Sequence, residues 1–169
     1  MGPIIANATG SDWFGTSSFS VSLWALVTSS VGPYDTAWYK GGAAIGDPGY
    51  DVELGMFAWS INVGDGSAVA MVILGNEPEL IGQWAHIVLV VDRQAGVLRG
   101  YANGVERGVT SIAGLGSVSS LTAATVSRPG FAFHGRIDEL EIIGRALEPE
   151  WIVLHAKNVR NPSAVMTIE

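Results

Sequence analysis

The stretch "WAHIVLVVDRQAGVLRGYANGVE", from Trp84 to Glu106, decides the fold of this chain. Its first nine residues, Trp84–Asp92, are apolar on both faces, which is typical of a central strand in a sandwich. A turn (RQAG) and a second strand (VLRGYAN) follow, and Asn103-Gly104 is the signal of a tight hairpin. The stretch therefore predicts two antiparallel strands and the start of a third.

Similar signals continue in both directions along the chain. The segment Phe19–Val27 alternates between apolar and polar residues, which indicates a strand with one buried side. Gly64-Asp65-Gly66 predicts a turn between two further strands, and "FHGRIDELEII" predicts a long strand near the end. A single helix is expected at "LEPEWIVLHAK", with Pro149 in its first turn. Many short strands with glycine-containing turns indicate an all-β sandwich or barrel.

Composition limits the alternatives. The chain has 169 residues, of which 48% are hydrophobic and 15% charged, and it contains 22 glycines. This predicts one domain over residues 1–169 with a substantial core, because disorder needs low hydrophobicity and high charge.

Charge and cysteine content exclude several classes of function. Nine basic residues and a net charge of −7 argue against nucleic-acid binding, which depends on neutralising phosphates. The absence of cysteine excludes disulfides, thiolate metal sites and cysteine catalysis. No apolar run reaches the roughly 18 residues of a membrane span, and the N-terminal stretch lacks the pattern of a signal peptide.

The order of these signals resembles the concanavalin A-like jelly rolls, in particular the laminin G-like group related to pentraxins. The resemblance extends from about Ser18 to Ala156, and it rests on order and spacing more than on any one motif. The matching positions are Trp84, His86, Asp92, Gly96, Tyr101, Asn103, Gly104, Gly135, Ile137, Asp138, Glu139 and Leu147.

This resemblance implies a two-sheet antiparallel jelly roll with one short C-terminal helix. Members of the family mostly bind glycans, proteins or lipids, many carry a structural calcium ion, and some relatives are glycoside hydrolases. Each activity predicts its own set of residues in this chain.

A hydrolase would use the carboxylates Glu139 and Glu141. On a regular strand these two side chains share one face at about 6.5–7 Å, within the range of inverting glycosidases. The related hydrolases have a row of three acids, whereas here Ile137 and Ile143 flank the pair. We therefore expect a solvated strand face and no catalysis.

Asp138 is the candidate calcium ligand. Regular alternation places it on the face that Leu140 and Ile142 bury, where a carboxylate needs a partner. Calcium is one such partner, and the resemblance suggests Asp12 as the second acid. The alternative is that Asp138 pairs with an arginine or accepts backbone N–H bonds in a turn.

A ligand that stacks on aromatic rings is expected near the loops of "VGPYDTAWYKGGAAIGDPGYD". Sugar rings pack against exposed aromatic faces, and polar side chains accompany them here. Trp24 and Trp84, in contrast, are expected in the core. The candidate ligand-binding residues are Tyr34, Asp35, Trp38, Tyr39, Lys40, Asp47 and Tyr50.

The histidines His86, His134 and His155 lack the spacing of a zinc site, and His86 is expected to be a hydrogen-bonded core residue. No nucleophile elbow is present.

These observations favour a non-catalytic recognition or surface-display module that binds a glycan or a protein. One hypothesis is a bacteriophage virion decoration or fibre protein, which predicts a homo-oligomer or docking to a larger assembly through the terminal segments "PIIA" or "AVMTI". The alternatives are an excised adhesion domain of a secreted protein and a glycoside hydrolase using Glu139 and Glu141. The expected location is a virion surface or the extracellular space.

Overall fold

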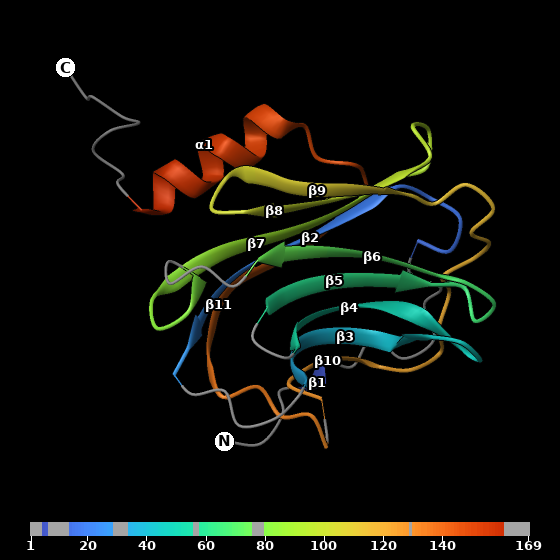
Figure 1. Ribbon diagram of the computed structural model, residues 1–169, viewed down its shortest axis with the longest axis horizontal. Coiled ribbons are helices and arrows are strands. Elements are labelled where there is room, and N and C mark those ends of the chain that lie inside the picture. Colours follow the sequence, from blue (N-terminus) through green and yellow to red (C-terminus); the bar gives the residue numbers. More distant parts are fainter. Residues whose placement is uncertain are drawn as a thin grey trace.

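Two antiparallel sheets face each other in the computed structural model (Figure 1). The structure describes residues 5–6, 14–28, 34–55, 58–75, 80–128 and 130–160. At residues 5, 6, 34, 159 and 160 it describes the backbone alone. The six-stranded sheet has the order β1-β10-β3-β4-β5-β6, with β1 (Ile5–Ala6), β10 (Ala124–Val126), β3 (Tyr34–Ala44), β4 (Asp47–Gly55), β5 (Ala58–Gly64) and β6 (Val69–Gly75). The five-stranded sheet has the order β11-β2-β7-β8-β9, with β11 (Gly135–Ile143), β2 (Phe19–Val27), β7 (Trp84–Asp92), β8 (Val97–Ala102) and β9 (Val105–Ser111). The predicted jelly-roll sandwich is confirmed.

The core lies between the two sheets, where inward side chains from both sheets meet. On β2 the alternation predicted from sequence is observed, since Phe19, Val21 and Leu23 are fully buried. Their partners from the other sheet include Tyr50 and Trp59, whose indole Nε1 donates to the Leu80 carbonyl at 3.0 Å.

Strand β7 is apolar on both faces because each face is covered. Ile87 and Leu89 point into the core between the sheets, whereas Val88 and Val90 belong to a second cluster with Ile152 of α1 (Pro149–Arg160). Figure 1 shows α1 lying across the outer side of the five-stranded sheet. The helix was predicted, and Pro149 begins it.

The hairpin between β8 and β9 is the expected two-residue turn. Asn103 has φ 55° and Gly104 has φ 81°, the positive values that a type I′ turn requires. The Asn103 side-chain oxygen also accepts a hydrogen bond from the His86 N–H at 3.0 Å. The turn thereby fastens the end of β8 to its neighbour β7.

The two tryptophans expected in the core differ. Trp24 is buried, but on the outer side of its sheet, where it stacks on His86. Trp84 is 37% exposed, so its predicted core position is wrong. It stands at the first position of β7, and the residues that follow it in the strand are buried up to Val91.

No helix in the described residues is both long enough and apolar enough to cross a membrane.

Candidate functional site

A pocket of about 240 Å³ opens on the outer face of the six-stranded sheet. We call it the β4 pocket, because β4 provides its floor. Tyr50, Val52 and Leu54 of this strand are buried in the core, so Asp51 and Glu53 between them point outward. The residues that line the pocket are Thr36, Gly42, Ala43, Asp51, Glu53, Asn62, Arg128 and Phe131.

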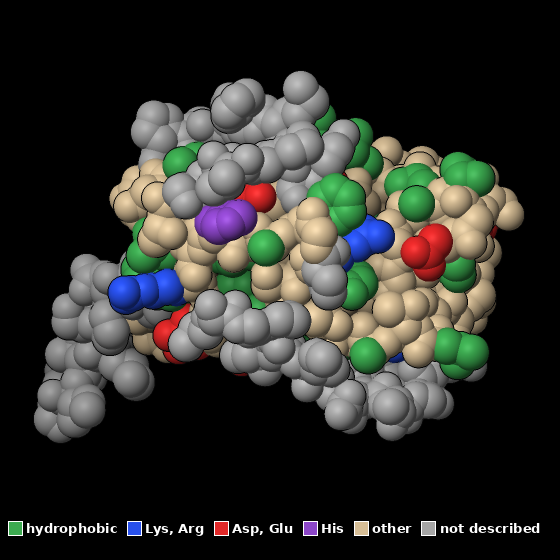
Figure 2. Space-filling view, turned by 90° about the horizontal axis from the view of Figure 1, so that it is seen from below, with side chains coloured by type: hydrophobic (Ala, Val, Ile, Leu, Met, Phe, Trp, Pro, Cys, Tyr) green, Lys and Arg blue, Asp and Glu red, His purple; other side chains and the backbone are tan. Residues whose placement is uncertain are grey.

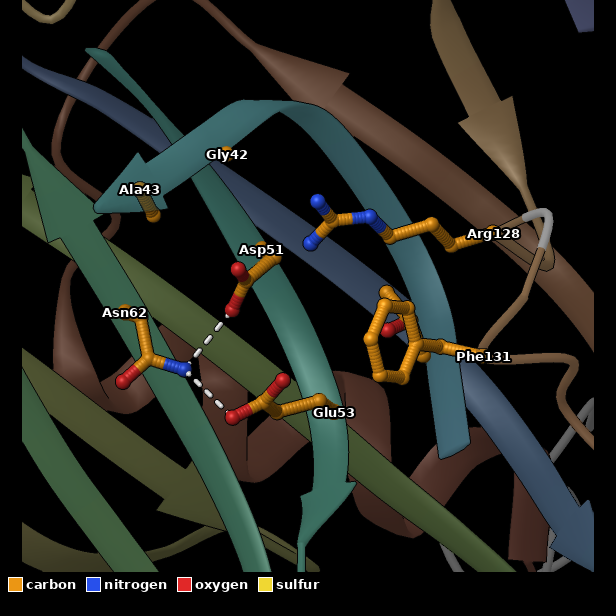
Figure 3. A pocket seen from close by; sticks show the side chains of 8 residues that line it. Gly42, Ala43, Asp51, Glu53, Asn62, Arg128 and Phe131 are labelled. Atoms are coloured by element: carbon orange, nitrogen blue, oxygen red, sulfur yellow. Dashed lines mark hydrogen bonds between the residues drawn. The ribbon is translucent and has the colours of Figure 1, made fainter. Parts of the chain in front are cut away.

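Strand β5 places an amide between the two carboxylates. Asn62 lies directly opposite Asp51 in the register of β4 and β5. Its Nδ2 donates to Asp51 Oδ1 at 2.7 Å and to Glu53 Oε1 at 3.1 Å, as Figure 3 shows. One amide nitrogen thus holds both acids side by side at the base of the pocket.

The end of β3 forms one wall by folding over the sheet. Ala43 has φ 45°, and the pairing of β3 with β4 is irregular between Gly41 and Ala44. Glycine at position 64 allows this close approach, because a Cβ there would lie 2.9 Å from the Ala43 carbonyl carbon. Gly42 and Ala43 therefore reach the pocket beside Asp51 (Figure 3).

The opposite wall comes from the segment that follows β10. The Thr36 N–H donates to the Phe131 carbonyl at 3.0 Å, which joins this segment to β3. The Arg128 guanidinium carbon lies 5.3 Å from the centre of the Tyr39 ring and 5.2 Å from that of Phe131. In Figure 3 the guanidinium points towards Asp51, so a cation faces the acid pair across the pocket.

Burial controls the charge of this acid pair. Asp51 is only 3% exposed, and desolvation together with the neighbouring charge of Glu53 raises its pKa to about 8. The bond from Asn62 and the charge of Arg128 oppose this rise. Burial also raises the pKa of Glu53. Near neutral pH the pocket therefore holds at least one protonated carboxyl, which can donate as well as accept hydrogen bonds.

The predicted stacking surface is wrong for Trp38 and Tyr50. Both rings lie in the core, with centres 5.2 Å apart, and offer no face to a ligand. They alternate with outward residues on β3 and β4, and the quoted loops are largely strand. Tyr39 does point outward, opposite Asp51, and stands next to Arg128 of the pocket.

The polar residues among the predicted ligand-binding residues also lie apart from one another. Lys40 is buried, and its Nζ donates to the carbonyls of Ser120 and Thr122 at 3.0 and 3.1 Å. Asp35 is buried 3.6 Å from His134, Asp47 is exposed, and the Tyr34 side chain lies outside the described residues.

A bulge in β11 changes the faces predicted for its acids. Glu139 has φ 47°, and the pairing with β2 shifts so that Asp138 lies opposite Trp24 and Glu141 opposite Ser22. Asp138 and Glu141 thus share the outer face, because residues opposite alternate positions of β2 point the same way. Asp138 is exposed, and its predicted position on the buried face is wrong.

Asp138, the candidate calcium ligand, makes a local hydrogen bond. Its Oδ1 accepts a hydrogen bond from the Glu139 N–H at 2.9 Å, the alternative that the sequence left open. No three His, Asp or Glu side chains within the described ranges gather closely enough to hold a metal ion. Asp12, the expected second ligand, lies outside the described residues.

Two histidines that are distant in sequence meet under α1. His86 is fully buried as expected, and its Nε2 lies 2.9 Å from Ser22 Oγ and 3.3 Å from His155 Nδ1. His155 stacks on Trp151 of the same helix, and its Nε2 lies 3.8 Å from Glu139 Oε2. Ser22 is completely buried, so this cluster fastens the helix and offers no nucleophile to a substrate.

Sequence reasoning did not identify the acids of the β4 pocket. The available signal was the alternation in Tyr50-Asp51-Val52-Glu53-Leu54, which places two acids on the side opposite three apolar residues. Asn62, Arg128 and Phe131 join them through pairing and chain reversal, which local sequence does not reveal.

The sequence matches a family model described as the concanavalin A-like lectin/glucanases superfamily over residues 5–153. The chain belongs to this superfamily. The observed jelly roll is the fold expected of such a member. A search of curated proteins found no match.

Solved structures with the same superfamily fold include bacterial binding domains. The binding domain of Paraclostridial Mosquitocidal Protein 1 has a TM-score of 0.74 and 18% identity over 94% of this chain and 41% of that one. The ligand binding domain of botulinum neurotoxin serotype D, in complex with N-acetylneuraminic acid, has a TM-score of 0.67 and 14% identity over 84% and 36%. The CBM40 domain of Ruminococcus gnavus IT-sialidase has a TM-score of 0.70 and 12% identity over 84% of each chain. This chain thus spans less than half of each toxin domain.

Proposed function

We propose that this superfamily member is a non-catalytic recognition module that binds a glycan in the β4 pocket. The observation that carries the proposal is the convergence of Asp51, Glu53 and Asn62 beneath Arg128 and Phe131. The neighbouring toxin and sialidase domains support a binding role, since their names describe binding domains and one holds a sugar.

The groups in the pocket match the chemistry of a sugar. Sugar hydroxyls donate and accept hydrogen bonds, and the pocket offers carboxyl, amide and guanidinium groups for both. Phe131 is 39% exposed, so part of its ring is open to pack against sugar C–H groups. Two separate kinds of contact therefore converge on one small volume.

The same geometry argues against hydrolysis. Both acids accept hydrogen bonds from a single amide, so they lie side by side at the base of the pocket. A glycosidase needs its two carboxyl groups on either side of the scissile bond. Glu139 and Glu141, the alternative catalytic pair, lie on an edge strand outside this pocket.

A glycan array in calcium and again in chelator tests the proposal. We expect binding to at least one glycan class, weakened about tenfold in Phe131→Ala and Arg128→Ala as a single stacking or hydrogen-bonding contact is lost. Leu121→Ala, at an exposed apolar residue, is the matched control and should bind as wild type.

Three results would contradict parts of the proposal. Binding that survives both pocket variants would place the glycan elsewhere. An absence of binding under all conditions would favour a protein partner. Turnover of an oligosaccharide that Glu53→Gln abolishes would make the module an enzyme.

We further propose display of the module on a virion surface or in the extracellular space, as a homo-oligomer or docked to a larger assembly, with a calcium ion held by Asp138 and Asp12. Sedimentation of the full chain in calcium and in chelator tests oligomer formation, and the glycan array under the same two conditions tests the calcium requirement. A monomer in both conditions would contradict oligomer formation, and glycan binding that survives chelator would exclude a calcium requirement.

A further inference from the structure

Strand β6, at the edge of the six-stranded sheet, carries an unusual exposed row. Its inward residues Ala70, Val72 and Leu74 are buried, whereas the alternate residues point outward. Edge strands commonly carry charged side chains that prevent unwanted association, but β6 has none in its sequence VAMVILG. The outward row, called the β6 stripe below, consists of Val69, Met71 and Ile73, which are 43%, 52% and 58% exposed.

The β6 stripe adjoins the β4 pocket through the register of three strands. Met71 lies opposite Asn62, which lies opposite Asp51. Ile73 lies opposite Ser60, whose hydroxyl reaches Glu53 Oε1 at 3.4 Å. Because opposite residues share a face and strands are about 4.8 Å apart, the stripe begins roughly 10 Å from the acid pair on the same surface.

The β6 stripe itself carries no charged side chain. Figure 2 shows one face of the molecule on which charged side chains stand in small separate groups among hydrophobic and uncharged atoms. Exposed apolar patches that border polar groups mark binding sites. A ligand that covers both the pocket and the stripe must be polar at one end and apolar within about 10 Å of it.

We propose that the β6 stripe binds the apolar aglycone of a glycoside whose sugar occupies the β4 pocket. This inference rests on the proposed glycan-binding function and adds the class of ligand, a glycoside with an alkyl or aryl group. Met71 suits this role because its flexible, polarisable side chain adapts to different apolar partners. The continuity of the stripe with a polar pocket favours this occupant over a second copy of the chain.

Titration calorimetry with methyl and octyl glycosides of glucose, galactose, mannose and N-acetylglucosamine tests the inference, at concentrations below micelle formation. We expect the octyl form of the bound sugar to bind at least tenfold more tightly than the methyl form, because burial of a few methylene groups suffices for such a gain. Met71→Ser/Ile73→Ser should abolish the gain and leave the affinity for the methyl form within about twofold.

Val105→Ser/Val109→Ser is the matched control. These two valines are 55% and 51% exposed on β9, in the other sheet, and their replacement should preserve the gain. Circular dichroism of both double variants establishes that each is folded.

The outcomes separate this inference from the proposed function. Equal affinity for methyl and octyl glycosides would overturn the aglycone site and leave the glycan pocket standing. A dimer that Met71→Ser/Ile73→Ser converts to monomer would assign the stripe to a second copy and overturn the inference. An absence of binding by any of these glycosides would contradict the aglycone site, and together with an empty glycan array it would contradict the glycan pocket as well. A gain lost only in the β6 variant would support both proposals.

Discussion

The outer faces of the two sheets use polar residues in opposite ways. On the five-stranded sheet, α1 covers the outward residues, and His86 lies within hydrogen-bonding distance of Ser22 and of His155. On the six-stranded sheet, the outward residues Asp51 and Glu53 share one amide donor at the base of an open pocket.

The difference shows that polar side chains covered by another element of the fold stabilise it, whereas polar side chains at an open pocket are available to a ligand. Polar groups that are buried must find partners inside the protein, and under α1 the His86 Nε2 atom finds them in Ser22 and His155. The acids of the β4 pocket are packed tightly enough to have raised pKa values, yet they line a space that a ligand can enter. Desolvated groups at the edge of a pocket are where binding is expected.

The largest effect is expected from Asp51→Asn as a function of pH. Folding raises the pKa of Asp51 from 3.8 to about 8, so its ionisation opposes folding. The contribution of protonated Asp51 to the free energy of unfolding is fully present below about pH 4 and is lost as the pH rises to about 8. The free energy of unfolding falls over this range with a limiting slope of about 1.4 kcal/mol per pH unit. The variant should therefore gain stability relative to wild type across this range, as measured by urea unfolding at several pH values.

Asp138→Asn is the control for this comparison. Asp138→Asn makes the same chemical change at an exposed carboxylate on β11, outside the β4 pocket. If the stability of Asp51→Asn and of wild type changed with pH in the same way, this would contradict the raised pKa of Asp51.

The covered face should lose stability through Ile152→Ala. Ile152 is fully buried between α1 and the five-stranded sheet, so truncation leaves a cavity that costs about 2–5 kcal/mol. Glycan binding by the remaining folded protein should not change. Leu154→Ala, 52% exposed on the same helix, should cost less than about 0.5 kcal/mol. Equal losses from the two variants would mean that α1 does not pack as described.

Serine to alanine on the two faces gives a direct contrast. Ser22→Ala removes a fully buried 2.9 Å contact with His86 and should cost about 1 kcal/mol. Ser60→Ala removes only a 3.4 Å bond to Glu53, which keeps its bond to Asn62, so the loss should be below about 0.5 kcal/mol. Thermal unfolding measures both, and a larger loss from Ser60→Ala would reverse the comparison.

The smallest effect is expected from Glu139→Gln/Glu141→Gln. These side chains lie on the edge strand β11 and outside the β4 pocket. We expect stability within about 0.5 kcal/mol of wild type and unchanged glycan binding. Loss of a hydrolytic activity in this variant would revive the catalytic alternative.

Much of the fold was predictable because its signals are local. The ends of β2 and β7 coincide with the predicted segments Phe19–Val27 and Trp84–Asp92, and the Asn103-Gly104 turn has the expected conformation. The alternation of side chains predicted the wrong face for Asp138, because the bulge at Glu139 inserts an extra residue into the strand. A pattern that repeats every two residues does not predict a bulge.

The sequence by itself determined which strands form, where they turn and that they enclose a core, because apolar alternation and turn chemistry act between near neighbours. Only the tertiary structure decided which polar residues meet. Asn62 reaches Asp51 through strand pairing, and Arg128 and Phe131 join them through a turn of the chain that begins 66 residues after Asn62. The pocket depends on contacts between residues that are distant in sequence, and such contacts do not produce a periodic pattern in the sequence.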